Sequence, residues 1–154
     1  QSLFVCTFLL GDNMEEKYFK LLIKLAERAV KHNEVPISAI IVKNNKILAK
    51  AYNKRERKHD VLNHAEVIAI KKASKKLKDW KLFDCDLYVT LKPCSICENI
   101  IKQSRIKNVY YLLEKSENKK EYNKTKFIKA NNCIYEQMYE YILHDFFKKK
   151  RDKK

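Results

Sequence analysis

Three side chains with metal-binding chemistry stand in the middle of the chain at spacings that can bring them together. Cys94 and Cys97 are three residues apart, so on a helix they share a face and can reach one ion at sulfur to metal distances of about 2.3 Å. His64 would supply a third ligand. Zinc with three protein ligands keeps an open tetrahedral position for water, the arrangement of catalytic rather than structural zinc. The remaining histidines have no comparable cysteine pair: His32, His59 and His144.

Glu66 is the residue that could turn such a metal site into a catalyst. It lies two residues after His64, a spacing that turns the two side chains to opposite sides of a regular helix. They converge only if metal and substrate lie beyond the helix N-terminus. Zinc lowers the pKa of its water to about 7, and Glu66, which is not a ligand, can take that proton and redeliver it to a substrate nitrogen and a leaving amine.

Each of these features has an ordinary explanation when it stands alone. A single histidine on a helix is usually structural, an isolated glutamate is usually a solvated charge, and Cys-x-x-Cys is as often a redox or structural zinc motif. The combination is more specific, because Pro93 directly precedes Cys94 and both His64 and Cys94 fall at expected strand-to-helix junctions. Helix N-termini there would favour the thiolate form of the cysteines.

The elements that position these residues alternate between helix and strand. Periodicity and turn chemistry predict a helix over 15–32, strands over 37–42 and 47–52 joined at Asn44-Asn45, a helix over 64–77, a strand over 87–90, a helix from Cys94 and a strand over 109–113. A polar loop is expected over 53–63. The order is that of an α/β protein, and the crossover helices favour parallel pairing of the later strands.

The two ends of the chain differ from this middle part. Residues 1–13 are expected to be an N-terminal extension or a targeting or cloning remnant, and 14–154 the functional domain. A closing helix is expected over 134–150 with a basic end, whereas the segment 114–132 has no assignment. Phe146 lies on the apolar face of that helix and is expected in the core, which leaves Phe147 as the candidate for contact with a base.

Composition limits the class of protein. A chain of 154 residues and 18.4 kDa fits one domain. Its longest apolar run is far shorter than the roughly 20 residues that span a bilayer, so a soluble protein without a membrane-spanning segment is expected. A net charge of +15 suggests nucleic acid, with an anionic membrane surface as second choice. Codon bias toward lysine and asparagine explains the charge equally well. The five cysteines point to a reducing compartment.

Together the motifs resemble the zinc nucleoside deaminase superfamily, whose pattern is His-x-Glu followed by Pro-Cys-x-x-Cys. More narrowly, the chain is similar to the bacterial-type tRNA-specific adenosine deaminases, over about residues 15–147. The residues that carry this resemblance are Glu34-Val35-Pro36, Asn53, His59-Asp60, His64-Ala65-Glu66, Thr90-Leu91, Pro93-Cys94, Cys97, Ser104-Arg105-Ile106 and Asp145-Phe146-Phe147.

The resemblance implies a fold, an assembly and residue roles. The fold would be a single three-layer α-β-α domain of the cytidine deaminase type, with helices on both faces of a mixed sheet. The protein would be a cytoplasmic homodimer with a tRNA anticodon loop crossing both subunits, or an organellar one if 1–13 is a targeting remnant. The implied roles are Zn²⁺ binding by His64, Cys94 and Cys97, proton transfer by Glu66, and base binding by Asn53, Ile37 and the Ala65 backbone.

The sequence also departs from this family. Ser38 and Lys92 stand where a glycine and a glutamate are usual, and Glu98-Asn99 replace small residues. The stretch from Leu112 to Lys115 lacks the family's small residue and aspartate. These departures fall on packing or RNA-contacting positions, so the reaction class is better supported than the substrate.

Three functions are consistent with the residues, two of them deaminases and the third from a different class. The first is hydrolytic deamination of adenosine to inosine at the wobble position of a tRNA anticodon. The second is deamination of a free base or nucleotide of guanine or cytosine type. The third is a non-catalytic zinc subunit that binds RNA, which would not need Glu66.

Overall fold

The computed structural model of the chain describes residues 16–114 and, beyond them, residues 126, 129, 137–138, 140–142, 144, 148 and 151–152. Contacts divide the chain into two units, 1–117 and 118–154, which are treated separately. In the second unit the described positions 137–138, 140–142, 144, 148 and 151 are helical. Residues 1–13, Phe146 and Phe147 lie outside the described residues.

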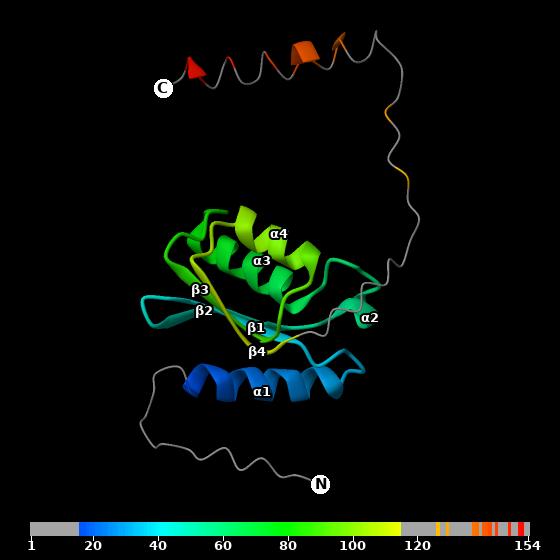
Figure 1. The fold of residues 1–154 in the computed structure, drawn as a ribbon, viewed down its shortest axis with the longest axis vertical. Helices are drawn as coiled ribbons and strands as arrows, with labels where there is room; N and C mark the ends of the chain where they lie inside the picture. Colours follow the sequence, from blue (N-terminus) through cyan, green and yellow to red (C-terminus); the bar gives the residue numbers. More distant parts are fainter. Residues whose placement is uncertain are drawn as a thin grey trace. The chain divides into compact units, whose positions relative to one another are not determined.

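Four strands of the first unit form one mixed sheet in the order β2-β1-β3-β4 (Figure 1). The strands are β1 (Ser38–Lys43), β2 (Lys46–Tyr52), β3 (Cys85–Leu91) and β4 (Asn108–Leu113). β1 pairs antiparallel with both β2 and β3, whereas β3 and β4 are parallel, as expected for strands joined by a crossover helix.

The β1–β2 connection confirms the expected hairpin. Asn44 and Asn45 have φ angles of 48° and 61°. Two successive residues with positive φ form the type I′ turn, whose twist matches that of paired strands. The register shifts by one residue between Ile41 and Val42, which leaves Leu48 of β2 as the extra residue of a bulge.

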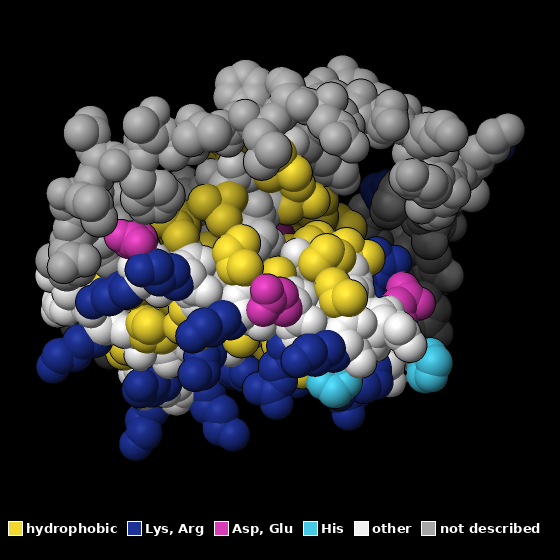
Figure 2. Space-filling model, turned by 90° about the horizontal axis from the view of Figure 1, so that it is seen from below, with side chains coloured by type: hydrophobic (Ala, Val, Ile, Leu, Met, Phe, Trp, Pro, Cys, Tyr) yellow, Lys and Arg dark blue, Asp and Glu magenta, His cyan; other side chains and the backbone are white. Residues whose placement is uncertain are grey.

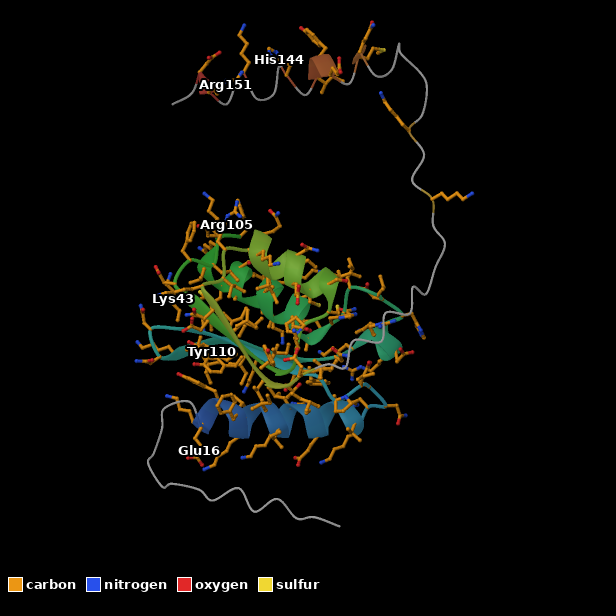
Figure 3. All side chains as sticks on the ribbon, in the orientation of Figure 1. Glu16, Lys43, Arg105, Tyr110, His144 and Arg151 are labelled. Atoms are coloured by element: carbon orange, nitrogen blue, oxygen red, sulfur yellow. The ribbon has the colours of Figure 1, made fainter. Side chains whose placement is uncertain are left out.

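Helices cover the sheet on both faces, which confirms the three-layer α-β-α architecture. α1 (Glu16–Val30) lies on one face, and α3 (Ala65–Leu77) and α4 (Ser95–Gln103) lie on the other (Figure 1). Figure 3 shows the side chains that fill both interfaces, with Glu16 on the side of α1 away from the sheet. No described helix is both long and apolar enough to cross a bilayer.

Each face of the sheet has its own apolar core. Under α1 the buried side chains include aromatic residues, with the Tyr88 ring 4.9 Å from that of Tyr18 and 4.8 Å from that of Tyr110. The core under α3 and α4 is built from aliphatic residues, alanines and cysteines: fully buried members are Ala39, Ile41, Ala65, Ala69, Ala73, Leu82, Cys85, Leu87, Val89 and Cys97. The small residues let α3 approach the sheet closely.

The polar loop expected over 53–63 contains a short helix, so that part of the prediction was incomplete. α2 (Arg55–Lys58) is held from outside the loop by Glu34, a buried residue whose carboxylate accepts hydrogen bonds from the backbone N–H of Glu56 at 3.2 Å and Arg57 at 2.9 Å. Because Glu34 is more than twenty positions upstream, no local sequence signal could reveal the helix.

Several turns place residues other than glycine in the left-handed region. Among the described residues these are Asn33, Asn44, Asn45, His59, Lys78, Asp84 and Arg105. His59 and Lys78 follow the last residues of α2 and α3, where the left-handed conformation ends a helix. The chain contains one glycine in total, Gly11, so other residues must form these turns.

Candidate functional site

Two helices begin at the same place in the fold, and each begins with a predicted metal ligand. His64 precedes α3 with φ −70° and ψ 148°, and Cys94 precedes α4 with φ −72° and ψ 166°. Both are extended residues whose carbonyl oxygens accept the first helical hydrogen bonds, from Ile68 and Glu98. The ligands therefore stand beyond the helix N-termini, which is the end-on approach that the His64 to Glu66 spacing requires.

The structure brings the three predicted ligands together. Their ligand atoms all lie within 4.8 Å of one another. His64 Nδ1 is 3.8 Å from Cys94 Sγ and 3.4 Å from Cys97 Sγ. Tetrahedral zinc with typical Zn–N and Zn–S bonds would separate nitrogen from sulfur by about 3.6 Å. Thus the donor set fits zinc in both chemistry and spacing.

A hydrogen bond between the two thiols favours the thiolate form of Cys94 over that of Cys97. The pKa of Cys94 is lowered to about 5, chiefly because the Cys97 thiol hydrogen-bonds to it. Burial opposes this shift, whereas the backbone N–H groups of Cys97 and Ile96 and the nearby His64 add to it. The pKa of Cys97 is raised, first by the same hydrogen bond and then by burial. The start of α4 thus stabilises a thiolate, the form that binds a metal.

Glu66 sits in the first turn of α3 and is almost fully buried, at 3% exposure. Burial is the main cause that raises the pKa of its carboxyl group. Its Oε2 atom is buried without a hydrogen-bond partner in the described part of the chain. A buried carboxylate oxygen without a hydrogen-bond partner lowers stability, so its presence calls for a functional explanation. A raised pKa suits a group that accepts and returns a proton during catalysis.

The residues expected to hold a base are linked to one another and to α3. Asn53, which is buried, accepts a hydrogen bond at its Oδ1 atom from the backbone N–H of Ala65 at 2.8 Å. Its own backbone N–H donates to the carbonyl of Ile37 at 3.0 Å. Because the side-chain oxygen is engaged, the Asn53 NH₂ group is the part of the amide that can donate to a further acceptor.

The loop before His64 is fixed from two sides. Glu34 holds α2, as described above. Asp60 accepts hydrogen bonds from the Leu62 backbone N–H at 2.8 Å and from Asn63 Nδ2 at 2.9 Å, which closes the turn directly before His64. The sequence placed both acidic residues in motifs without giving them a role. Their role is to position the loop that connects Asn53 to His64.

The departures from the family pattern are accommodated locally. Ser38 is buried and donates from Oγ to the Leu22 carbonyl at 2.7 Å, which ties β1 to α1. Lys92 forms an ion pair with Glu114 at 2.6 Å, and Tyr111 donates to the same carboxylate at 2.8 Å. None of these contacts involves His64, Cys94, Cys97 or Glu66. Phe147, the predicted base contact, lies outside the described residues.

Comparison with known proteins agrees with this geometry. The family model of MafB19-like deaminases matches residues 13–151. A tRNA-specific adenosine deaminase from Rickettsia bellii is 36% identical over 141 residues, which cover 84% of this chain and 97% of the relative. A solved structure from work on A-to-I editing by tRNA:A34 deaminases aligns with TM-score 0.65 and 33% identity, over 66% of this chain and 74% of the other. The structure of guanine deaminase from Bacillus subtilis aligns with TM-score 0.72 and 26% identity, over 88% and 95%.

Proposed function

Since the chain belongs to the family of tRNA-specific adenosine deaminases, we propose that it converts adenosine to inosine at the wobble position of a tRNA anticodon. The reaction is hydrolytic: water adds at C6 of adenine and ammonia leaves. The observation that carries the proposal is the convergence of His64, Cys94 and Cys97 beside the buried, unpartnered carboxylate oxygen of Glu66.

The proposed roles follow the geometry of the site. His64, Cys94 and Cys97 would hold zinc, which supplies a Lewis acid that makes water acidic near neutral pH. Glu66 accepts a proton from the attacking water and returns protons to the ring nitrogen and the leaving amine. Asn53 orients the base through its NH₂ group, and its oxygen keeps the start of α3 in place.

The remaining expectations concern the rest of the chain. We propose that 14–154 is the catalytic domain, including a basic C-terminal helix, and that 1–13 is an extension. Phe147 and the lysines after it are proposed to contact RNA, because aromatic and cationic side chains bind unstacked bases and phosphates together. The protein is proposed to act in the cytoplasm.

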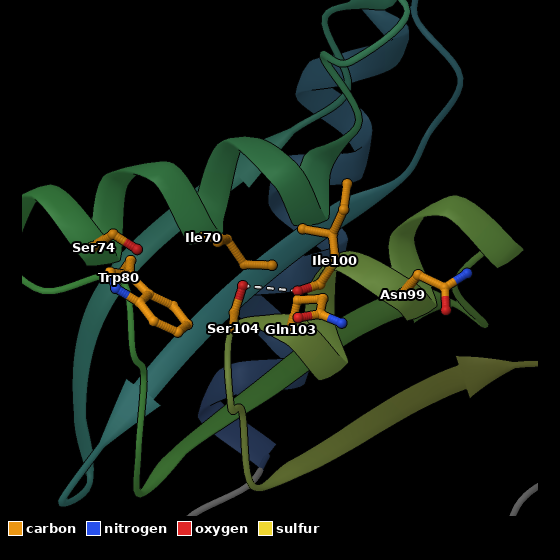
Figure 4. Close-up of a pocket in the computed structure, with 7 residues that line it drawn as sticks. All are labelled: Ile70, Ser74, Trp80, Asn99, Ile100, Gln103 and Ser104. Carbon is orange, nitrogen blue, oxygen red and sulfur yellow. Dashed lines mark hydrogen bonds between the residues drawn. The ribbon is translucent and has the colours of Figure 1, made fainter. Parts of the chain in front are cut away.

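A homodimer is also proposed, and the α3–α4 face offers a surface for it. A groove of about 320 Å³ lies between the two helices, lined by Ile70, Ser74, Trp80, Asn99, Ile100, Gln103 and Ser104 (Figure 4). The Trp80 side chain stands at this groove with 57% exposure, and Ile96 on α4 is 54% exposed. Sedimentation across a range of concentrations should show a dimer, and Trp80→Glu should shift it toward monomer.

The proposed function is tested directly with RNA. Anticodon stem-loops with adenosine at the first anticodon position are incubated with the protein, and inosine is scored by nuclease digestion and mass spectrometry. Free adenosine and a stem-loop with adenosine elsewhere serve as controls. We expect inosine only in the first substrate. Its absence from every RNA would refute the proposal.

Deamination of free guanine is the second candidate, because the guanine deaminase structure aligns over nearly the whole of both chains. This reaction would use the same ligands and the same carboxylate. It predicts ammonia release from guanine with little dependence on salt, whereas binding of RNA weakens steeply as salt rises. Guanine and the stem-loop therefore belong in the same assay.

A further inference from the structure

A positively charged groove lies on the side of the molecule where β2 meets α3. It has a volume of about 460 Å³ and is lined by Ile47, Leu48, Ala49 and Lys50 of β2 and by Lys72 and Lys76 of α3. No acidic residue is among these lining residues. β2 is the outer strand of the described sheet on this side, so the groove opens along an exposed strand edge.

The lysines of the groove are close enough to affect one another. Lys72 Nζ donates to the Lys50 carbonyl at 3.0 Å, which fixes its position across the groove. The pKa of Lys72 is lowered, first by partial burial and then by the charges of Lys54 and Lys50. Within the described part of the chain, no ion pair involves Lys50, Lys54, Lys72 or Lys76. The cluster is therefore a concave site for an anion.

This concentration of charge differs from the distribution of charge on α1. On α1, Glu16 and Glu27 interrupt the lysines, and Lys20 pairs with Glu16 at 2.7 Å. Figure 2, seen from the α1 side, shows many lysine and arginine side chains over one half of that face, with a few acidic side chains and hydrophobic ones beside them. The lysines of α1 therefore have acidic neighbours, whereas among the described residues the lysines of the groove do not, and the high lysine content of the chain does not explain this difference.

The two elements that line the groove also reach the candidate site. β2 ends at Tyr52 and is followed at once by Asn53, and α3 begins at Ala65 beside the metal ligands. Lys72 and Lys76 are about 10 and 16 Å along the helix from that start, at 1.5 Å per residue. A nucleic acid strand advances by about 3.4 Å or more per nucleotide, so a few nucleotides span this distance.

We infer that this groove binds the phosphates of the substrate RNA strand adjacent to the nucleotide held at the site, an inference that rests on the proposed function. The occupant we propose is a polyanion with charges repeated along its length, because lysines line both walls of the groove, Lys50 on β2 and Lys72 and Lys76 on α3. An alternative role for these lysines is to keep other strands from pairing with the β2 edge. That role requires no RNA.

The experiment measures binding of the wobble-adenosine stem-loop by fluorescence anisotropy at several salt concentrations. Lys72→Glu with Lys76→Glu should weaken binding by about 10- to 100-fold at low salt and reduce the slope of log affinity against log salt by about 1 to 2. The matched control, called the α1 control, reverses the same amount of charge at two exposed lysines, Lys24 of α1 and Lys31 directly after it. It should change affinity by less than about threefold.

Further variants separate charge from folding. Lys72→Arg with Lys76→Arg keeps the charge and should bind almost as the unchanged protein does. If the glutamate variant melts early, Lys72→Gln with Lys76→Gln replaces it, and a salt slope reduced relative to the α1 control is again expected. In stem-loop turnover the groove variants should raise KM and leave kcat unchanged.

The outcomes distinguish the groove from the proposed function. Equal loss of affinity in the groove and α1 variants overturns the groove inference while inosine formation still supports the function. Failure of the unchanged protein to bind the stem-loop overturns the groove inference. Binding through the groove without inosine formation supports the groove and refutes the deaminase activity on this RNA.

Discussion

The same helix takes part in two very different regions. At its first turn, α3 carries the buried Glu66 and follows directly after His64, whereas two to three turns later it carries the exposed Lys72 and Lys76. The first region depends on individual atoms whose neighbours are fixed by hydrogen bonds. The second depends on the number and sign of charges along a groove.

This difference predicts how each region responds to substitution. In a site built from specific donor atoms, replacement by a similar residue is damaging, because a different atom cannot take the same proton or bind the same metal. In the groove a similar residue is harmless and a charge reversal is not. The predictions below test the first half of this comparison, from the largest effect to the smallest.

Removal of the metal or of one ligand should have the largest effect. Purified protein should contain about one zinc per chain. Cys97→Ser should lose that zinc and all detectable turnover, although the replacement differs by one atom. Stripping zinc with a chelator should lower the melting temperature, because ligand bound only to the folded state adds about 4 kcal/mol at a thousandfold excess over Kd. Protein that is metal-free yet fully active contradicts the site.

Glu66 should matter almost as much to turnover and hardly at all to the metal. Glu66→Gln keeps the shape and removes the proton transfer, so kcat should fall by about 10³-fold, or about 4 kcal/mol. Glu66→Ala should likewise keep zinc and the fold. Zinc content by mass spectrometry and circular dichroism are the controls. Unchanged kcat in either variant would mean that another group moves the proton.

Asn53 should have an intermediate effect that can be divided into two parts. Asn53→Ala removes both the acceptor for the Ala65 N–H and the NH₂ donor, so KM should rise about tenfold and the unfolding free energy should fall by about 1 kcal/mol. Asn53→Asp keeps the acceptor and loses the donor. It should therefore keep stability and still raise KM. Equal KM in Asn53→Asp and the unchanged protein would assign base binding elsewhere.

Glu34 should have the smallest effect on turnover, because it acts only through the loop. Glu34→Gln leaves one acceptor for two backbone N–H groups of α2, and should lower the unfolding free energy by about 1–3 kcal/mol. KM should rise only a few-fold. Glu27→Gln, on the exposed side of α1, is the control and should change stability by less than about 0.5 kcal/mol. Equal stability in the two variants would remove Glu34 as the anchor.

Much of the fold and the ligand set could be predicted because the signals are local. The Asn44-Asn45 turn, the periodicity of α1 and the residues at the starts of α3 and α4 all depend on neighbours in sequence. The position of α2 depends on Glu34, far upstream, and could not be read locally. The groove could not be predicted from the sequence for another reason. In a chain with this many lysines, only the folded structure shows which lysines lie together without acidic neighbours.

The left-handed turns have a consequence for how well the fold tolerates heat. A residue with a side chain is destabilised by about 1 kcal/mol in the left-handed conformation, compared with glycine in the same conformation. Replacement by glycine removes this cost, but part of the gain is lost because glycine also makes the unfolded chain more flexible. Lys78, which follows the last residue of α3, and Arg105, just beyond α4, bear such costs far from the reacting groups. Replacing these residues with glycine, one turn at a time, should therefore raise the thermal stability of this glycine-poor chain by small steps and leave catalysis unchanged.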